Sequence, residues 1–95
     1  IPAGAYDPAN ADIAYSPQAM SVAAGTTVTW INEDSVFHTI TSGSSNGTTA
    51  TPDGNFDSGE VQTGEIYAHT FDSIGTFDYY CIPHPWMVGQ IQVTG

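Results

Sequence analysis

The sequence predicts an antiparallel β-sandwich or barrel, and three observations point to this fold class. Short segments rich in β-branched and aromatic residues recur along the chain, separated by Gly, Pro, Ser and Asn. No stretch of about ten residues shows the periodicity of an amphipathic helix. The length, 95 residues, suits one domain of this kind. We therefore expect a single domain over residues 11–95, preceded by an extended arm or linker remnant with little order over residues 1–10.

The clearest strand is predicted at residues 27–32, where Val28 and Trp30 fall on one face of a segment dense in β-branched and aromatic residues. Residues 42–55 contain mainly Gly, Ser, Thr and Asn, so we expect a long and mobile surface excursion there, without readable chemistry. Further extended segments are expected at residues 14–15, 18–23, 36–41, 65–71, 76–80 and 89–94.

One segment near the C-terminus, Cys81-Ile82-Pro83-His84-Pro85-Trp86-Met87, carries three kinds of metal ligand. A thiolate, an imidazole and a thioether together suit a soft, redox-active metal better than a hard one. His38 lies at the edge of a predicted strand, and loops at one end of a sandwich can meet although they are distant in sequence. We therefore predict one copper ion held by His38, Cys81 and His84, with Met87 as a weak axial ligand.

The same residues also allow interpretations other than copper binding. A lone Cys or Met is often an ordinary core residue, and zinc also accepts Cys and His ligands. The third histidine, His69, shares a strand face with Tyr67 and Phe71, which favours a packing or hydrogen-bonding role over a ligand role. A multicopper oxidase is excluded because three histidines cannot furnish both this site and a trinuclear cluster.

The charge of the chain is strongly one-sided. It has no Lys or Arg against ten carboxylates, which gives a formal net charge of −10. Such a surface disfavours nucleic acid and anionic lipid and favours a basic protein partner, although acidity also serves solubility in salty surroundings. We find no segment apolar enough to span a bilayer and no signal-like start at residues 1–4.

The order and spacing of the motifs after Met20 resemble the cupredoxins, particularly the plastocyanin-like and amicyanin-like proteins. The likeness is carried by residues 30–34 with 38–43, 56–59, 67–71 with 75–77, and 80–89. The resemblance implies an all-β, Greek-key β-sandwich with a mononuclear type 1 copper at His38, Cys81, His84 and Met87. The short Cys-x-x-His-x-x-Met loop looks most like that of amicyanin.

The resemblance also implies a function. The expected protein is a monomer that carries single electrons by cycling between Cu(I) and Cu(II), with electrons leaving at the His84 edge. An apolar patch of residues near His84, namely Pro83, Pro85, Trp86 and Val88, would dock transiently with a basic redox protein such as a c-type cytochrome. The family works outside the cytoplasm, so we expect a periplasmic or cell-surface protein, with membrane anchoring of a longer form left open.

Two departures from the family pattern keep alternatives open. Thr39 stands where many members carry an Asn that ties the two ligand loops together, so that link is expected to be weaker or rebuilt. Trp86 lies beside Met87 and could open the axial position to a small ligand, which would allow redox chemistry on nitric oxide or nitrite. Copper storage or delivery, and a metal-free adhesion-type sandwich, are the remaining alternatives.

Overall fold

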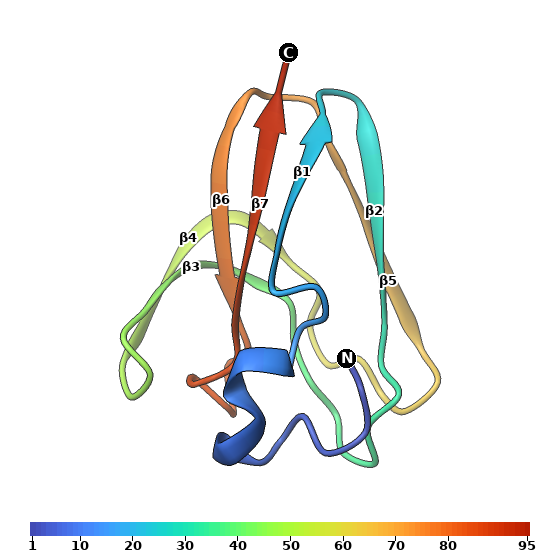
Figure 1. The fold of residues 1–95 in the computed structure, drawn as a ribbon, viewed down its shortest axis with the longest axis vertical. Helices are drawn as coiled ribbons and strands as arrows, with labels where there is room; N and C mark the ends of the chain where they lie inside the picture. Colours follow the sequence, from blue (N-terminus) through green and yellow to red (C-terminus); the bar gives the residue numbers. More distant parts are fainter.

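Seven strands and one short 3-10 helix make up the chain, and the computed structural model describes all of residues 1–95 (Figure 1). The predicted all-β class is therefore confirmed. The elements in chain order are η1 (Pro8–Ile13), β1 (Ala19–Ala23), β2 (Thr26–Ile31), β3 (Thr41–Ser45), β4 (Ala50–Asp57), β5 (Ile66–Phe71), β6 (Gly75–Tyr80) and β7 (Val88–Thr94).

The strands form two sheets that face each other as the layers of a β-sandwich. One sheet has the order β1-β7-β6-β3-β4 and the other consists of β2 and β5. Four of the five strand pairs are antiparallel, as predicted, but β1 runs parallel to β7. The Greek-key sandwich implied by the resemblance is confirmed. Figure 1 shows that the 81–87 loop and the N-terminal segment lie at the same end of the sandwich.

Trp30 of β2 is the centre of the aromatic core between the sheets. Its ring centroid lies 5.5 Å from that of Tyr79, 5.7 Å from Tyr67 and 6.3 Å from Phe71. His69 packs among these aromatic groups, with its ring 4.8 Å from that of Phe71. The prediction of a packing role for His69 agrees with this position.

The predicted surface excursion at residues 42–55 is wrong, because most of it forms the β3–β4 hairpin. Small polar residues can make strands when their side chains bond to the neighbouring main chain. The Ser42 hydroxyl donates to the carbonyl of Phe56 and accepts from the Phe56 amide, at 3.0 and 2.8 Å. A Cβ on Gly43 would lie 2.1 Å from the carbonyl oxygen of Thr51, so only glycine permits this close approach.

Residues 36–41, which were expected to be extended, form little regular strand. Only Thr41 begins a strand, while His38 makes an isolated bridge with Val61. The main chain of His38 donates to the Val61 carbonyl and accepts from the Val61 amide, at 3.1 and 2.8 Å. The segment is thus extended and held in place, although it belongs to neither sheet.

The N-terminal segment is ordered, contrary to our expectation of little order in residues 1–10. The side chain of Ala5 is 1 % exposed, and η1 begins after Asp7, whose carboxylate accepts from the amide of Ala9. The main chain of Ile1 pairs with the carbonyl of Ile31 and the amide of Glu33. Small residues gave the segment a linker-like composition, but its main-chain hydrogen bonds attach it to the domain.

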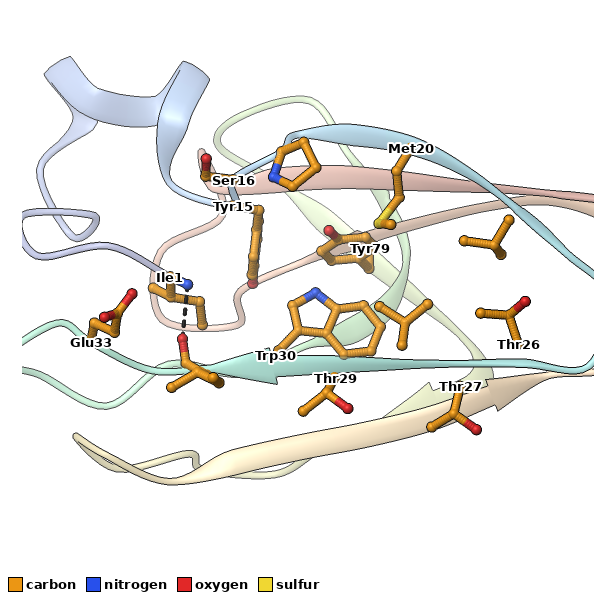
Figure 2. A pocket seen from close by; sticks show the side chains of 14 residues that line it. Ile1, Tyr15, Ser16, Met20, Thr26, Thr27, Thr29, Trp30, Glu33 and Tyr79 are labelled. Carbon is orange, nitrogen blue, oxygen red and sulfur yellow. Dashed lines mark hydrogen bonds between the residues drawn. The ribbon is translucent and has the colours of Figure 1, made fainter.

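A cavity of about 400 Å³ lies where β1 and β2 separate (Figure 2). Trp30, Tyr79 and Met20 contribute apolar walls to it, and Glu33 lies on its lining. None of the four predicted copper ligands lines this cavity. The cavity is therefore separate from the predicted metal site.

Gly89→Ala tests the packing of the aromatic core against β7. Gly89 pairs with Tyr79 across β6 and β7, and an added Cβ would lie 2.3 Å from the Tyr79 ring. We expect the free energy of unfolding to fall by about 1–3 kcal/mol, the usual cost of overpacking. Thermal or urea unfolding of the metal-free protein measures it. Gln92→Ala, at an exposed position of the same strand, is the control and should change stability by less than about 0.5 kcal/mol.

Candidate metal centre

The loop from Cys81 to Met87 is built by main-chain hydrogen bonds between the predicted ligand positions. The amide of His84 donates to the carbonyl of Cys81 at 3.3 Å, and the amide of Met87 donates to the carbonyl of His84 at 2.9 Å. The amide of Cys81 closes the loop on the carbonyl of Met87 at 3.2 Å. Two successive turns and one closing bond therefore fix the spacing of Cys81, His84 and Met87.

The structure brings three of the four predicted ligands together. The donor atoms of His38, Cys81 and His84 all lie within 4.8 Å of one another. Cys81 Sγ is 3.7 Å from Nδ1 of His38 and 3.4 Å from Nδ1 of His84. Nitrogen and sulfur donors that share one ion through bonds of about 2.0–2.3 Å have separations of this order. The spacing therefore fits a single ion, and the combination of one thiolate, two imidazoles and a nearby thioether suits copper.

Burial acts in opposite directions on the readiness of Cys81 and His84 to bind a metal at neutral pH. Burial raises the pKa of the Cys81 thiol, an effect that hydrogen bonds from Thr39 and the His84 amide partly oppose, so the thiol is protonated until a metal displaces the proton. Burial, with a smaller contribution from nearby His38, lowers the pKa of His84. The His84 imidazole is then neutral and keeps a lone pair for a metal.

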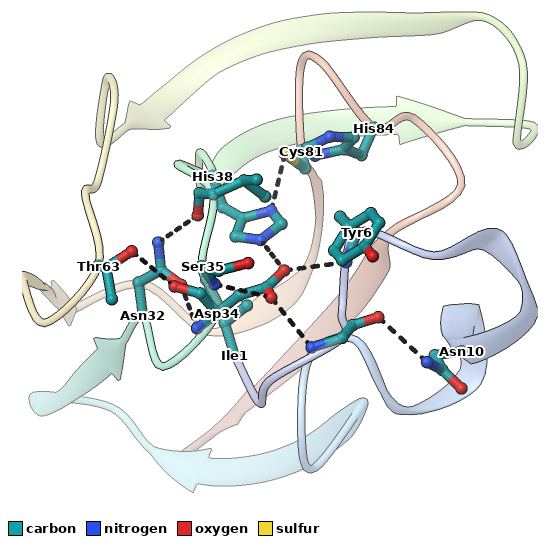
Figure 3. A network of polar contacts seen from close by, with 12 residues as sticks. Ile1, Tyr6, Asn10, Asn32, Asp34, Ser35, His38, Thr63, Cys81 and His84 are labelled. Atoms are coloured by element: carbon teal, nitrogen blue, oxygen red, sulfur yellow. Dashed lines mark hydrogen bonds and ion pairs between the residues drawn. The ribbon is translucent and has the colours of Figure 1, made fainter.

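His38 is oriented by Asp34, a residue that our sequence reasoning missed. Figure 3 shows the imidazole of His38 between the carboxylate of Asp34 and Cys81. His38 Nε2 lies 2.8 Å from Oδ2 of Asp34, and both side chains are almost fully buried. Because the carboxylate can only accept a hydrogen bond, it favours the tautomer with the proton on Nε2, and the lone pair of Nδ1 then faces Cys81. The only signal in the sequence was an acidic residue four positions before a candidate ligand.

Thr39 rebuilds the link between the two ligand segments. Its hydroxyl oxygen accepts from the amide of Ile82 at 2.9 Å, and its own amide donates to Cys81 Sγ at 3.4 Å. The hydroxyl also lies 2.9 Å from that of Thr41. Of the two outcomes expected for this link, weaker or rebuilt, the structure shows the second, a direct connection through a different side chain.

Met87 and Trp86 occupy different environments. The side chain of Met87 is 0 % exposed and belongs to the hydrophobic core. The ring of Trp86 packs against that of His84 at 5.4 Å, and its Nε1 is buried without a hydrogen-bond partner. Ser45, in the hairpin where no chemistry was expected, donates through its hydroxyl to the carbonyl of Pro85 and supports the loop from outside.

Comparisons with known proteins agree with this site. Residues 3–94 match the copper binding proteins of the plastocyanin/azurin family. The chain is 29 % identical over 92 residues to amicyanin-alpha of Methylorubrum extorquens, covering 97 % of this chain and 74 % of that one. It is 34 % identical over 83 residues to amicyanin of Paracoccus denitrificans, covering 87 % of this chain and 60 % of that protein. This chain thus spans three fifths to three quarters of these relatives.

A solved structure shows the same likeness over nearly the whole chain. A purple cupredoxin from Nitrosopumilus maritimus superposes with a TM-score of 0.83 and is 40 % identical. The match covers 99 % of this chain and 95 % of that one. The resemblance therefore includes the N-terminal segment as well as the metal loop.

Thr39→Val tests the link between the ligand segments. Valine keeps the shape of threonine but cannot accept from the Ile82 amide, which leaves that donor unpaired. We expect a loss of about 1–3 kcal/mol in the free energy of unfolding of the metal-free protein. Thr39→Ser keeps the hydroxyl and is expected to retain most of this stability. Equal stability of the two variants would show that the hydroxyl does not hold the segments together.

Proposed function

Because this chain belongs to the plastocyanin/azurin family of copper-binding proteins, we propose that it carries single electrons between redox partners. The proposed ligands are His38, Cys81 and His84, with Met87 in the axial position. The observation that carries the proposal is the convergence of both Nδ1 atoms on the buried Cys81 sulfur. A thiolate and two imidazoles with a weak thioether form the ligand set of blue-copper electron-transfer sites.

Bound copper supplies a one-electron couple between Cu(I) and Cu(II). The chain contributes a hydrogen-bonded frame around the ligands. This frame consists of the hydrogen bonds within the 81–87 loop, the Thr39 link and the Asp34–His38 contact. Such a frame resists rearrangement between oxidation states, which suits repeated electron transfer.

Exposure of the ligands points to the face where a partner docks. His38, Cys81 and Met87 are buried, whereas His84 is partly exposed. The apolar patch around His84 (Pro83, Pro85, Trp86 and Val88) also gains Ile82, whose side chain is 55 % exposed. Because His84 is the only accessible ligand, it gives electrons a short path to the surface. The apolar patch beside it provides a contact from which a partner dissociates easily.

The proposed partner is a basic redox protein such as a c-type cytochrome. The net charge of −10, with no Lys or Arg, attracts a positively charged surface over several ångströms before contact. We place the protein outside the cytoplasm on the strength of its family. No helix in the structure is long and apolar enough to cross a membrane.

The alternative of redox chemistry on nitric oxide or nitrite needs an open copper position. The full burial of Met87 within the core argues against easy displacement of its side chain. Trp86 packs on His84 and is itself partly buried, so it covers the loop from one side. We therefore favour the electron carrier, and the response to nitrite separates the two functions.

Addition of one equivalent of Cu(II) to the purified protein tests the site. We expect an intense thiolate-to-copper absorption band and narrow copper hyperfine splitting in the electron paramagnetic resonance spectrum. Cys81→Ser should abolish the band because it removes the thiolate. His69→Phe should keep it, since His69 is outside the ligand cluster.

Two results would count against the proposed carrier. A pale, ordinary copper spectrum from the unaltered protein would mean that Cys81 is not a ligand. A spectrum that changes on addition of nitrite would support the small-molecule alternative, whereas an unchanged spectrum supports the carrier.

Electron transfer to a basic c-type cytochrome tests the proposed partner class. We expect the second-order rate constant, measured by stopped flow, to fall by at least tenfold between about 0.01 and 0.15 M salt, because the Debye length shrinks from about 30 to about 8 Å. An acidic redox protein of similar potential is the control and should react faster as salt is added. A rate with the basic cytochrome that is independent of salt would contradict electrostatic steering.

A further inference from the structure

The N-terminal segment reaches the metal centre through Asp34. The amide of Gly4 donates to Oδ1 of Asp34 at 2.9 Å, and the amide of Tyr6 donates to Oδ2 at 3.0 Å (Figure 3). Ala5, between these two donors, has its side chain buried. The segment is therefore packed against the domain at the point where its main chain contacts the carboxylate.

The carboxylate of Asp34 has no free acceptor position left. A carboxylate offers about four lone-pair sites. The Oδ1 atom accepts from Gly4 and from the amide of Ser35 at 2.9 Å, and Oδ2 accepts from Tyr6 and from His38 Nε2 at 2.8 Å. Asp34 is 1 % exposed, so these donors stand where water would otherwise solvate the charge.

The loop around Asp34 fixes its main chain but supplies only part of this environment. Asn32 accepts from the amide of Asp34 at 2.9 Å, and the Thr63 hydroxyl donates to the Asp34 carbonyl at 2.7 Å. Of the donors to the carboxylate, only Ser35 and His38 come from this loop and the segment that follows it. The other two come from residues about thirty positions away in the sequence.

We propose that Asp34 is a positioning residue for the copper ligand His38, and that the amides of Gly4 and Tyr6 hold its carboxylate in place. The inference rests on the proposed function, since it assigns the N-terminal segment to the same copper site. In this arrangement residues 4–6 exclude water from Asp34 and keep the Nε2 proton of His38 directed at a buried charge. The N-terminal segment thereby sets the properties of a metal that it does not touch.

A buried negative charge beside His38 has a predictable effect on the redox couple. It makes the imidazole a stronger donor and stabilises the more highly charged Cu(II) relative to Cu(I). Removal of the charge, or its hydration after the N-terminal segment loosens, should therefore raise the reduction potential. The two changes act through one contact, so their effects should not add.

The first test replaces the charge by Asp34→Asn. Loss of a hydrogen-bonded partner behind a metal-binding histidine commonly costs about tenfold in metal affinity. If the affinity for Cu(II) falls tenfold and the affinity for Cu(I) is unchanged, the one-electron reduction potential rises by about 59 mV. Voltammetry measures the potential of the copper-loaded protein. Hydrogen exchange of His38 Nε2–H, followed by NMR in the metal-free protein, gives a reading that does not depend on copper.

The second test loosens the segment without altering Asp34. Gly4 has a φ of +86°, so Gly4→Ala strains the turn that presents its amide. Gly25 has a similar φ of +91° in the β1–β2 turn, at the opposite end of the sandwich (Figure 1). Gly25→Ala therefore imposes comparable backbone strain far from the metal centre and is the matched control, while at Gly4 the added Cβ also comes within 3.3 Å of Asn10 Nδ2.

We expect Gly4→Ala to raise the potential by less than Asp34→Asn and to speed exchange of His38 Nε2–H, while Gly25→Ala changes neither. The double variant Gly4→Ala/Asp34→Asn should match Asp34→Asn alone. Equal shifts in both glycine variants, additive shifts in the double variant, or no shift with Gly4→Ala would overturn the proposal. Failure of the unaltered protein to form a type 1 copper spectrum would instead overturn the proposed function. Hydrogen exchange of His38 Nε2–H would still test whether the N-terminal segment protects the contact between Asp34 and His38.

Discussion

The connection between two short segments, residues 38–39 and residues 81–82, is the constraint on which the metal centre depends. They come from opposite halves of the chain. The Thr39 hydroxyl accepts a hydrogen bond from the Ile82 amide, and the Thr39 amide donates one to the Cys81 sulfur. The sandwich brings the segments to one end, but these bonds set their separation. Without them the loop turns would still fix His84 relative to Cys81, but the distance from the His38 imidazole to the thiol would depend only on the fold and on the His38–Val61 bridge.

Support for each ligand increases with its burial. The Nε2 atom of His38 is hydrogen-bonded to Asp34, and both its main-chain amide and its carbonyl are hydrogen-bonded to Val61. His84 is held mainly by the turns of its own loop and is partly exposed. This asymmetry fits a carrier, because a fixed inner ligand keeps the geometry constant while an accessible outer ligand meets the partner.

Sequence reasoning succeeded where the signal was local. Residue type and alternation in residues 27–32 and 89–94 predicted β2 and β7, and the Cys-x-x-His-x-x-Met spacing predicted a loop that the structure builds from successive turns. It failed for β3 and β4, whose Ser, Thr and Gly residues form strands through contacts such as Ser42 with Phe56. Hydroxyl bonds to a distant main chain leave no pattern in hydrophobicity.

The sequence by itself determined the all-β class, the chemistry of the donor set and the acidic character of the surface, because these follow from residue types and short spacings. Only the tertiary structure decided which groups stand behind the ligands. Asp34 could be read as a loop carboxylate, and Gly4 and Tyr6 as part of a disordered arm, until the fold placed their main-chain amides on that carboxylate. Main-chain donors carry no side-chain signature, so contacts that they make across about thirty residues appear only when the chain is folded.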